Sequence, residues 1–340
     1  MNVTPARWKI WTALLVIYVV WGSTYLAIKI AVRTQPPLLS GGTRFIAAGL
    51  VLAAILAAAR RSLRVSRGEL AASLLLGILL LACGVGVVTV AETRIDSSVA
   101  AMIAGSVPLQ VVIWRSIARE RVAHATRLAA AVGLVGLALI VVPSGSSGGS
   151  TAVGLALMVG ASISWSTGSF VSRRVPLPAD PFVATVYEML GGGIALVALG
   201  LLLGEGVHRD DLAASPLFAW LYLAVFGSLI AFTAYAWLLR RAPISQVVTH
   251  QYVNPLVAVT LGALLLGERL TATTLAGAGI VIAAVFVTVR HETRPPSRRS
   301  RDDPEALEVC AETAPEGDLS GRPRVGSSSR ASQSLAPTSL

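Results

Sequence analysis

Charged side chains inside long apolar stretches are the residues of this chain best placed to do chemistry. Lys29, Arg44 and Glu188 are the deep ones, and Glu188 is the one carboxylate well inside such a stretch. Charges at these depths are costly and therefore functional candidates. A buried carboxyl group can bind and release a proton, since burial favours its neutral form and a nearby cation its ionised form. We expect Glu188 to be the candidate carrier of a coupling proton.

Arg44 and Glu188 occupy equivalent places in the two halves of the chain. Each lies seven residues after a proline, Pro37 or Pro181, so both lie at similar depths counted from opposite faces. Two hypotheses follow: Arg44 tunes a proton-carrying Glu188 near the midplane, or the two form a structural pair that keeps the halves in register. Lys29 lies near an outer end, where it either reaches toward water or attracts anionic groups of a substrate.

A second group of polar side chains lies close together in the second half. His250, Gln251 and Asn254 fall on one helical face, and Pro255 leaves a backbone carbonyl without its helical partner. This face is predicted to line a cavity. Hydrogen bonds between helices or to water would satisfy the same groups, so a substrate role and a structural role both stay open.

Aromatic residues supply a third candidate group, formed by Trp21, Tyr25 and Trp165. With nearby hydroxyl side chains they could line a binding site for an organic solute; the hydroxyls are Ser23, Ser166, Thr167 and Ser169. The alternative is close helix packing through Gly22, Gly168 and the same small hydroxyls.

The elements that carry these residues are membrane helices. The chain of 340 residues is 54% hydrophobic and 14% charged, against about 25% charged in soluble domains. Runs of about 20 apolar residues cross the hydrocarbon layer. The expected fold is all-α with ten transmembrane helices, at 10–31, 38–59, 70–91, 98–117, 127–142, 153–171, 182–203, 217–239, 245–266 and 273–289.

Several classes of protein are excluded by the distribution of charge. The net charge is +10, but the basic residues sit in short gaps between apolar runs rather than on one face, which argues against nucleic acid as a partner. Lys occurs only at Lys9 and Lys29, so no phosphate-binding P-loop exists. Neither a metal site nor a cofactor site is predicted, and the protease motifs of membrane enzymes are missing. We expect no enzyme.

Arg and Lys also predict topology, because most of them fall in alternate loops. The positive-inside rule then puts both termini in the cytoplasm, with the chain in the cytoplasmic membrane. Residues 143–152 form a flexible connector between two five-helix repeats, 10–142 and 153–289. Residues 290–340, rich in Pro, Ser, Arg, Asp and Glu, are predicted to be a disordered cytoplasmic tail.

Each half holds an odd number of spans, so the second half enters the membrane inverted relative to the first. Ordered short motifs recur at the proper spans of the two halves: Trp21-Gly22-Ser23-Thr24-Tyr25, Arg44-Phe45, Pro108, Glu120-Arg121, Phe226-Gly227-Ser228 and Asn254-Pro255 through Gly267-Glu268-Arg269. Together they resemble the EamA-type transporters of the drug/metabolite transporter superfamily. The resemblance implies a central cavity between the repeats and export of amino acids, metabolites or toxic organic compounds with an ion gradient, expected here to be protons.

The sequence thus predicts a secondary transporter that exports small organic solutes by alternating access. An uptake permease or facilitator of the same fold stays open, because the gradients decide direction. A receptor or scaffold acting through residues 291–340 is the alternative from a different class. Glu120 and Glu268 are interpreted as helix terminators and interface anchors. The oligomeric state is left open, with a homodimer as one option.

Overall fold

The computed structural model describes residues 7–95, 100, 103–141, 151–208, 211, 213–257 and 272–292, and within these ranges the regular structure is helical and contains no strand. Residues 250–257 are helical as well. The remaining elements are α1 (Arg7–Ala31), α2 (Pro37–Ala58), α3 (Arg67–Leu76), η1 (Gly77–Gly86), α4 (Val87–Ala91), α6 (Val107–Ile117), α7 (His124–Val141), α8 (Ala152–Val171), α9 (Pro181–Leu202), α10 (Ala214–Tyr222), η4 (Leu223–Phe232), α11 (Thr233–Arg241), α12 (Ile244–Val247) and α14 (Ala272–Glu292).

Five helices of the described part are long and apolar enough to cross a membrane. They are Pro37–Ala58, Arg67–Ala91, Ala152–Val171, Pro181–Leu202 and Ala214–Arg241, accompanied by the shorter apolar helices Val107–Ile117, His124–Leu139 and Leu275–His291. The prediction of an all-helical protein is therefore confirmed, while the count of ten spans stays a prediction. The connector and the tail fall almost wholly outside the described residues.

Local sequence signals explain where the helices begin. Proline at the first position starts both α2 and α9, where the missing N–H costs no hydrogen bond. Asp180 caps α9 by accepting a hydrogen bond from the Phe182 N–H at 2.9 Å. Ser66 and Glu69 form a reciprocal capping box at the start of α3. Caps of this kind fix the depth at which each later residue lies.

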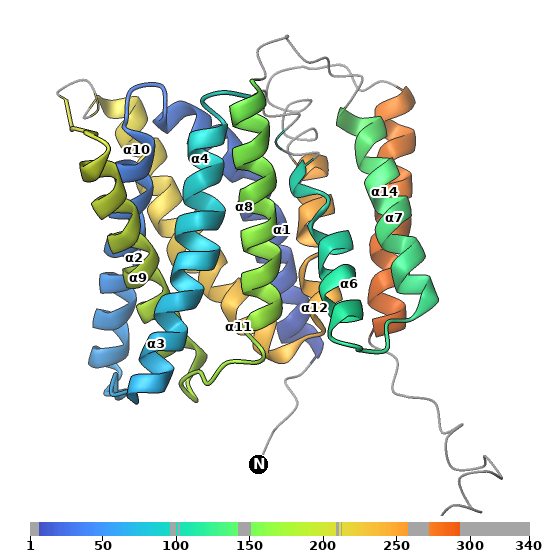
Figure 1. Ribbon diagram of the computed structural model, residues 1–340, viewed down its shortest axis with the longest axis horizontal. Coiled ribbons are helices and arrows are strands. Elements are labelled where there is room, and N and C mark those ends of the chain that lie inside the picture. Colours follow the sequence, from blue (N-terminus) through green and yellow to red (C-terminus); the bar gives the residue numbers. More distant parts are fainter. Residues whose placement is uncertain are drawn as a thin grey trace, which may run out of the picture. The chain divides into compact units, whose positions relative to one another are not determined.

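The helices pack in pairs, and each pair joins a helix of the first half to a helix of the second half. α2 lies along α9, and α7 lies along α14 (Figure 1). The η1 segment contacts α8 and α9, whereas η4 contacts α1 and α2, which hold the equivalent places in the first half. A methyl group placed on Gly42 would lie 2.8 Å from the Gly193 carbonyl oxygen, so small residues allow the close approach of α2 and α9.

Two π-helical segments occupy equivalent positions in the two halves. The η1 and η4 segments are ten residues long, and each interrupts one of the long apolar helices. Such widening of a helix is rare and frequently marks a functional site. Both segments contribute side chains to the central cavity described below.

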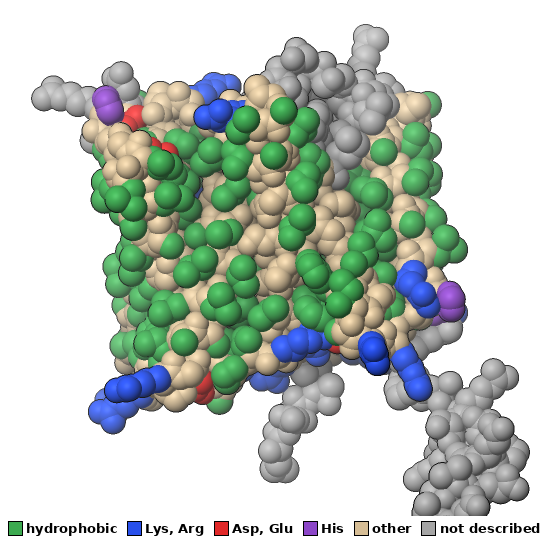
Figure 2. Space-filling view, viewed as in Figure 1, with side chains coloured by type: hydrophobic (Ala, Val, Ile, Leu, Met, Phe, Trp, Pro, Cys, Tyr) green, Lys and Arg blue, Asp and Glu red, His purple; other side chains and the backbone are tan. Residues whose placement is uncertain are grey.

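The outer surface suits a lipid environment. Figure 2 shows hydrophobic side chains over the middle of the visible face, with Lys and Arg gathered at its edges, most of them at the lower edge. Exposed apolar side chains include Leu15, Ile55 and Phe286, which are 61%, 53% and 62% exposed. Apolar surface of this extent is typical of proteins in contact with lipid.

Candidate functional site

The site is a cavity that lies between helices of both halves. Its volume is about 800 Å³, which includes space open to solvent. The cavity runs from the middle of α1 toward its C-terminal end. Its described lining is Trp21, Thr24, Ile28, Arg44, Phe45, Leu81, Gly84, Val85, Val88, Ala104, Val107, Met158, Ala161, Ser162, Trp165, Gly227, Ser228, Phe232, His250, Gln251 and Asn254.

An aromatic layer lies at the end of this cavity that is nearest the middle of α1. It consists of Trp21, Trp165, Tyr235 and His250, which come from α1, α8, α11 and the helical segment 250–257. The ring of Trp21 lies 5.5 Å from Trp165, 5.1 Å from Tyr235 and 4.9 Å from His250, measured between centroids. These tilted and edge-on contacts are the arrangements that aromatic pairs prefer.

Hydrogen bonds fix the rings of the aromatic layer. The Trp21 indole N–H donates to the Gly227 carbonyl at 3.1 Å. The Tyr235 hydroxyl lies 2.5 Å from Ser169 Oγ, and Ser169 donates its own proton to the Trp165 carbonyl at 2.6 Å. Tyr235 must therefore donate to Ser169, since a hydroxyl has one proton. These bonds hold Trp21 against η4 and Tyr235 against α8.

Six of the residues predicted to form the site line the cavity, and three do not or cannot be placed. Those that line it are Trp21, Arg44, Trp165, His250, Gln251 and Asn254. Glu188 is 3% exposed but does not line the cavity. The side chains of Tyr25 and Lys29 lie outside the described part. The functional roles expected for these six residues stay predictions.

The small hydroxyls predicted near the aromatic residues are engaged in helix packing. Ser23 bonds to the Tyr222 hydroxyl at 2.6 Å, and Ser166 donates to Gln110 at 2.8 Å. Gly168 approaches Leu80 so closely that a methyl group there would lie 2.8 Å from Leu80 Cδ2. For these positions the contacts favour the packing alternative, while the two tryptophans face the cavity.

Arg44 and Glu188 lie at different depths along the α2 and α9 pair. A methyl group on Gly193 would lie 2.9 Å from the Gly42 carbonyl oxygen and 3.0 Å from the Ile46 amide, so Gly193 is level with Arg44. Glu188 is five residues from Gly193, which is about 7.5 Å along a helix. Arg44 and Glu188 therefore do not lie side by side, although each lies seven residues after a proline.

Each of these two buried charges is attracted by a different residue. Glu92, which follows α4, attracts Arg44, and Arg240 in α11 attracts Glu188. The structural pair of Arg44 with Glu188 therefore finds no support in the described contacts.

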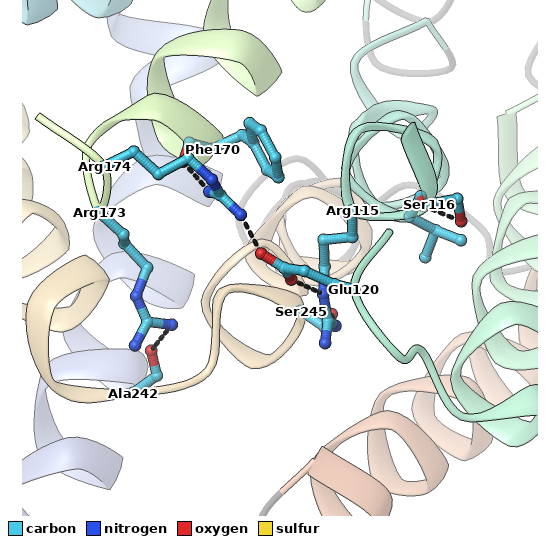
Figure 3. A network of polar contacts seen from close by, with 9 residues as sticks. Arg115, Ser116, Glu120, Phe170, Arg173, Arg174, Ala242 and Ser245 are labelled. Carbon is cyan, nitrogen blue, oxygen red and sulfur yellow. Dashed lines mark hydrogen bonds and ion pairs between the residues drawn. The ribbon is translucent and has the colours of Figure 1, made fainter. Parts of the chain in front are cut away.

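A polar network lies beyond the aromatic layer, at the ends of α6 and α8 (Figure 3). Glu120 forms ion pairs with Arg115, at 3.0 Å from its Nε, and with Arg174. Arg115 also donates to Ser245 Oγ at 2.6 Å, and Arg173 donates to the Ala242 carbonyl at 3.4 Å. These contacts tie α6 to α12 and to α8, and they tie the end of α8 to Ala242 after α11.

Sequence reasoning missed Tyr235, Phe232 and this network. Tyr235 and Phe232 sit in an apolar helix where nothing local distinguishes cavity-facing rings from core rings. Arg115 and Arg174 served as topology markers, and Glu120 was interpreted as an interface anchor. Glu120 and Arg174 are far apart in the sequence, and they meet because α6 packs against α8.

The sequence matches the EamA-like transporter family twice, over residues 8–142 and 152–290. The chain belongs to the EamA-like transporter family. It is 37% identical over 276 residues to the uncharacterized inner membrane transporter YedA of Escherichia coli K12, covering 81% of this chain and 89% of that protein. A probable amino-acid metabolite efflux pump of Salmonella typhimurium is 26% identical, covering 81% of this chain and 93% of its own length.

A solved crystal structure shows the same fold. Its TM-score is 0.69 at 19% sequence identity, and the match covers 85% of this chain and all of the other. The resemblance found in the sequence is thus confirmed at the level of the family. This EamA-like protein is a membrane transporter of small-molecule solutes and not an enzyme.

Proposed function

We propose that this protein is a secondary transporter that exports small organic solutes across the cytoplasmic membrane by alternating access. Ten helices form two inverted repeats of five, residues 10–142 and 153–289, and both termini lie in the cytoplasm. The observation that carries the proposal is a cavity between the repeats that ends at an aromatic layer. Alternating access needs such a site, reachable from one side at a time.

The polar network supports this mechanism because it can close one side reversibly. The Glu120 and Arg174 side chains are 38% and 36% exposed, and ion pairs this exposed contribute about 0.2–1 kcal/mol each. Several such contacts together hold α6, α8 and α12 in place. Their small individual energies allow the helices to separate without a large barrier.

Glu188 is proposed to carry the coupling proton. Its side chain is 3% exposed, and its Oε2 atom has no hydrogen-bond partner among the described residues. A carboxyl group in this setting can hold a proton, and the attraction of Arg240 favours releasing it.

Export is favoured over uptake by the relatives. The Salmonella protein is named as a probable efflux pump for amino-acid metabolites. The direction does not follow from the cavity itself, since an alternating-access site works both ways.

The test is solute-driven proton flux in liposomes that contain the purified protein. A panel of amino acids and of cationic and aromatic toxic compounds is compared between wild type, Glu188→Gln and Glu69→Gln. Glu69 is a partly exposed residue in the capping box of α3, outside the cavity, and Gln preserves that box.

We expect proton flux with wild type and Glu69→Gln, and at least a ten-fold loss with Glu188→Gln. Full flux with a folded Glu188→Gln protein would remove Glu188 from the mechanism. Solute movement without proton flux would contradict proton coupling, and no movement of any solute would contradict transport by this cavity.

A further inference from the structure

Arg44 is the one Lys, Arg, Asp or Glu side chain in the described lining of the cavity. It is 5% exposed, and its Nε atom has no hydrogen-bond partner among the described residues. An unpaired donor on a buried cation carries the full cost of its lost hydration. The site is therefore built to receive an acceptor.

The guanidinium group of Arg44 is held in place on one face. Its Cζ atom lies 4.7 Å from the centroid of the Phe45 ring, a cation–π contact that fixes the plane. Glu92 attracts Arg44 but does not line the cavity. The Arg44 guanidinium group has five N–H donors. A counter-ion outside the cavity, such as Glu92, therefore leaves some of these donors for a ligand.

Three more polar atoms of the lining lack partners in the described part. They are Trp165 Nε1, Asn254 Oδ1 and Ser228 Oγ. The amide oxygen can only accept a hydrogen bond, so it calls for a donor on the ligand. Most of the remaining wall is apolar or aromatic, including Phe45, Trp165 and Phe232, and its other polar side chains are Thr24, Ser162, His250 and Gln251.

We propose that the cavity selects solutes with a single carboxylate on a compact apolar or aryl body, and that Arg44 is the residue that recognises the carboxylate. This inference rests on the proposed transport function and narrows its substrate class. A planar carboxylate matches the guanidinium fork in two parallel hydrogen bonds.

The same geometry argues against other head groups. A cationic solute would face Arg44 with no acidic side chain in the described lining to compensate its charge. A dianion would bring a second charge for which this lining holds no second Lys or Arg side chain. A neutral solute would fit the apolar wall but leave the Arg44 donor unpaired.

The test uses three probes with one body and three head groups: 3-phenylpropanoate, its amide 3-phenylpropanamide, and 3-phenylpropylamine. Equilibrium binding to the full-length protein in nanodiscs is measured by titration calorimetry. We expect wild type to bind the carboxylate at least ten-fold more tightly than the amide and the amine.

Arg44→Gln should bind the amide within three-fold of wild type and lose the preference for the carboxylate. Arg33→Gln changes an exposed arginine outside the cavity and should keep that preference. The melting temperature of each variant checks folding, and the wild-type comparison of head groups stands even if Arg44→Gln does not fold. Equal wild-type binding of acid and amide, or a carboxylate preference that survives Arg44→Gln, would overturn the inference.

Transport assays with the same probes separate this inference from the proposed function. Equal movement of acid and amide by wild type would overturn the carboxylate selection while leaving transport in place. Binding of the acid through Arg44 without movement of any probe would support the site and contradict transport of this class.

Discussion

Glu120 and Arg174 form an ion pair that joins the end of α6 to the end of α8. The other carboxylate oxygen of Glu120 takes Arg115, which in turn donates to Ser245 at the start of helix α12. One carboxylate thereby connects three helices that are distant in the sequence. This connection lies on the far side of the aromatic layer from the cavity, where a closed gate is needed.

Glu120→Gln is expected to loosen this closed end without unfolding the protein. Gln keeps the size of the side chain but loses both charge interactions. The exposed pair with Arg174 contributes about 1 kcal/mol or less. The readout is the rate of maleimide labelling of Ala242→Cys, a 2% exposed position, in a background lacking Cys83 and Cys310. Labelling should become several-fold faster, and an unchanged rate would argue against a gate.

Asp180 has two separable roles, in the cap of α9 and in the ion pair with Arg61 at 2.8 Å. Asp180→Asn keeps the cap and loses the pair, so the free energy of unfolding should fall by less than about 1 kcal/mol. Asp180→Ala loses both the cap and the pair, so the free energy of unfolding should fall by roughly 1 kcal/mol more. Arg61→Gln is the matched control, and chemical unfolding in detergent gives the values. A larger loss with Asn than with Ala would contradict this division.

Gly192 is predicted to tolerate no side chain. A methyl group there would lie 2.5 Å from the Gly77 carbonyl oxygen and 2.7 Å from Leu81 Cβ. Gly192→Ala should destabilise the protein by about 1–3 kcal/mol through overpacking of α9 against η1. Gly160→Ala in α8 meets nothing within 4 Å and should leave the melting temperature equal or slightly higher. Equal melting temperatures for the two variants would contradict the close packing.

Tyr252 links the second half to α7, because its hydroxyl donates to the Ala130 carbonyl at 2.5 Å. Tyr252→Phe should cost about 1 kcal/mol, the usual net value of one hydrogen bond. Tyr252→Ala should cost about 3–5 kcal/mol, because it also leaves a cavity in a 1% exposed site. Thermal unfolding in detergent measures both, and equal losses would show that the ring contributes nothing to packing.

Local patterns in the sequence determined the helices and much of the cavity wall. Proline at positions 37 and 181 sets the start of α2 and α9, and apolar runs set where helices lie. The ordered motifs identified the family, which the match over both halves confirmed. The spacing of His250, Gln251 and Asn254 put them on one face, because helical periodicity is a property of neighbouring residues.

The tertiary structure alone decided which charges meet. Counting residues from each end placed Arg44 and Glu188 at equal depths, but the register of α2 against α9 depends on glycine contacts between the halves, and it separates them. The ion pair of Glu120 with Arg174 and the central place of Tyr235 also depend on contacts between distant helices. Such contacts depend on how whole helix surfaces pack, and the spacing of residues within one helix does not predict that packing.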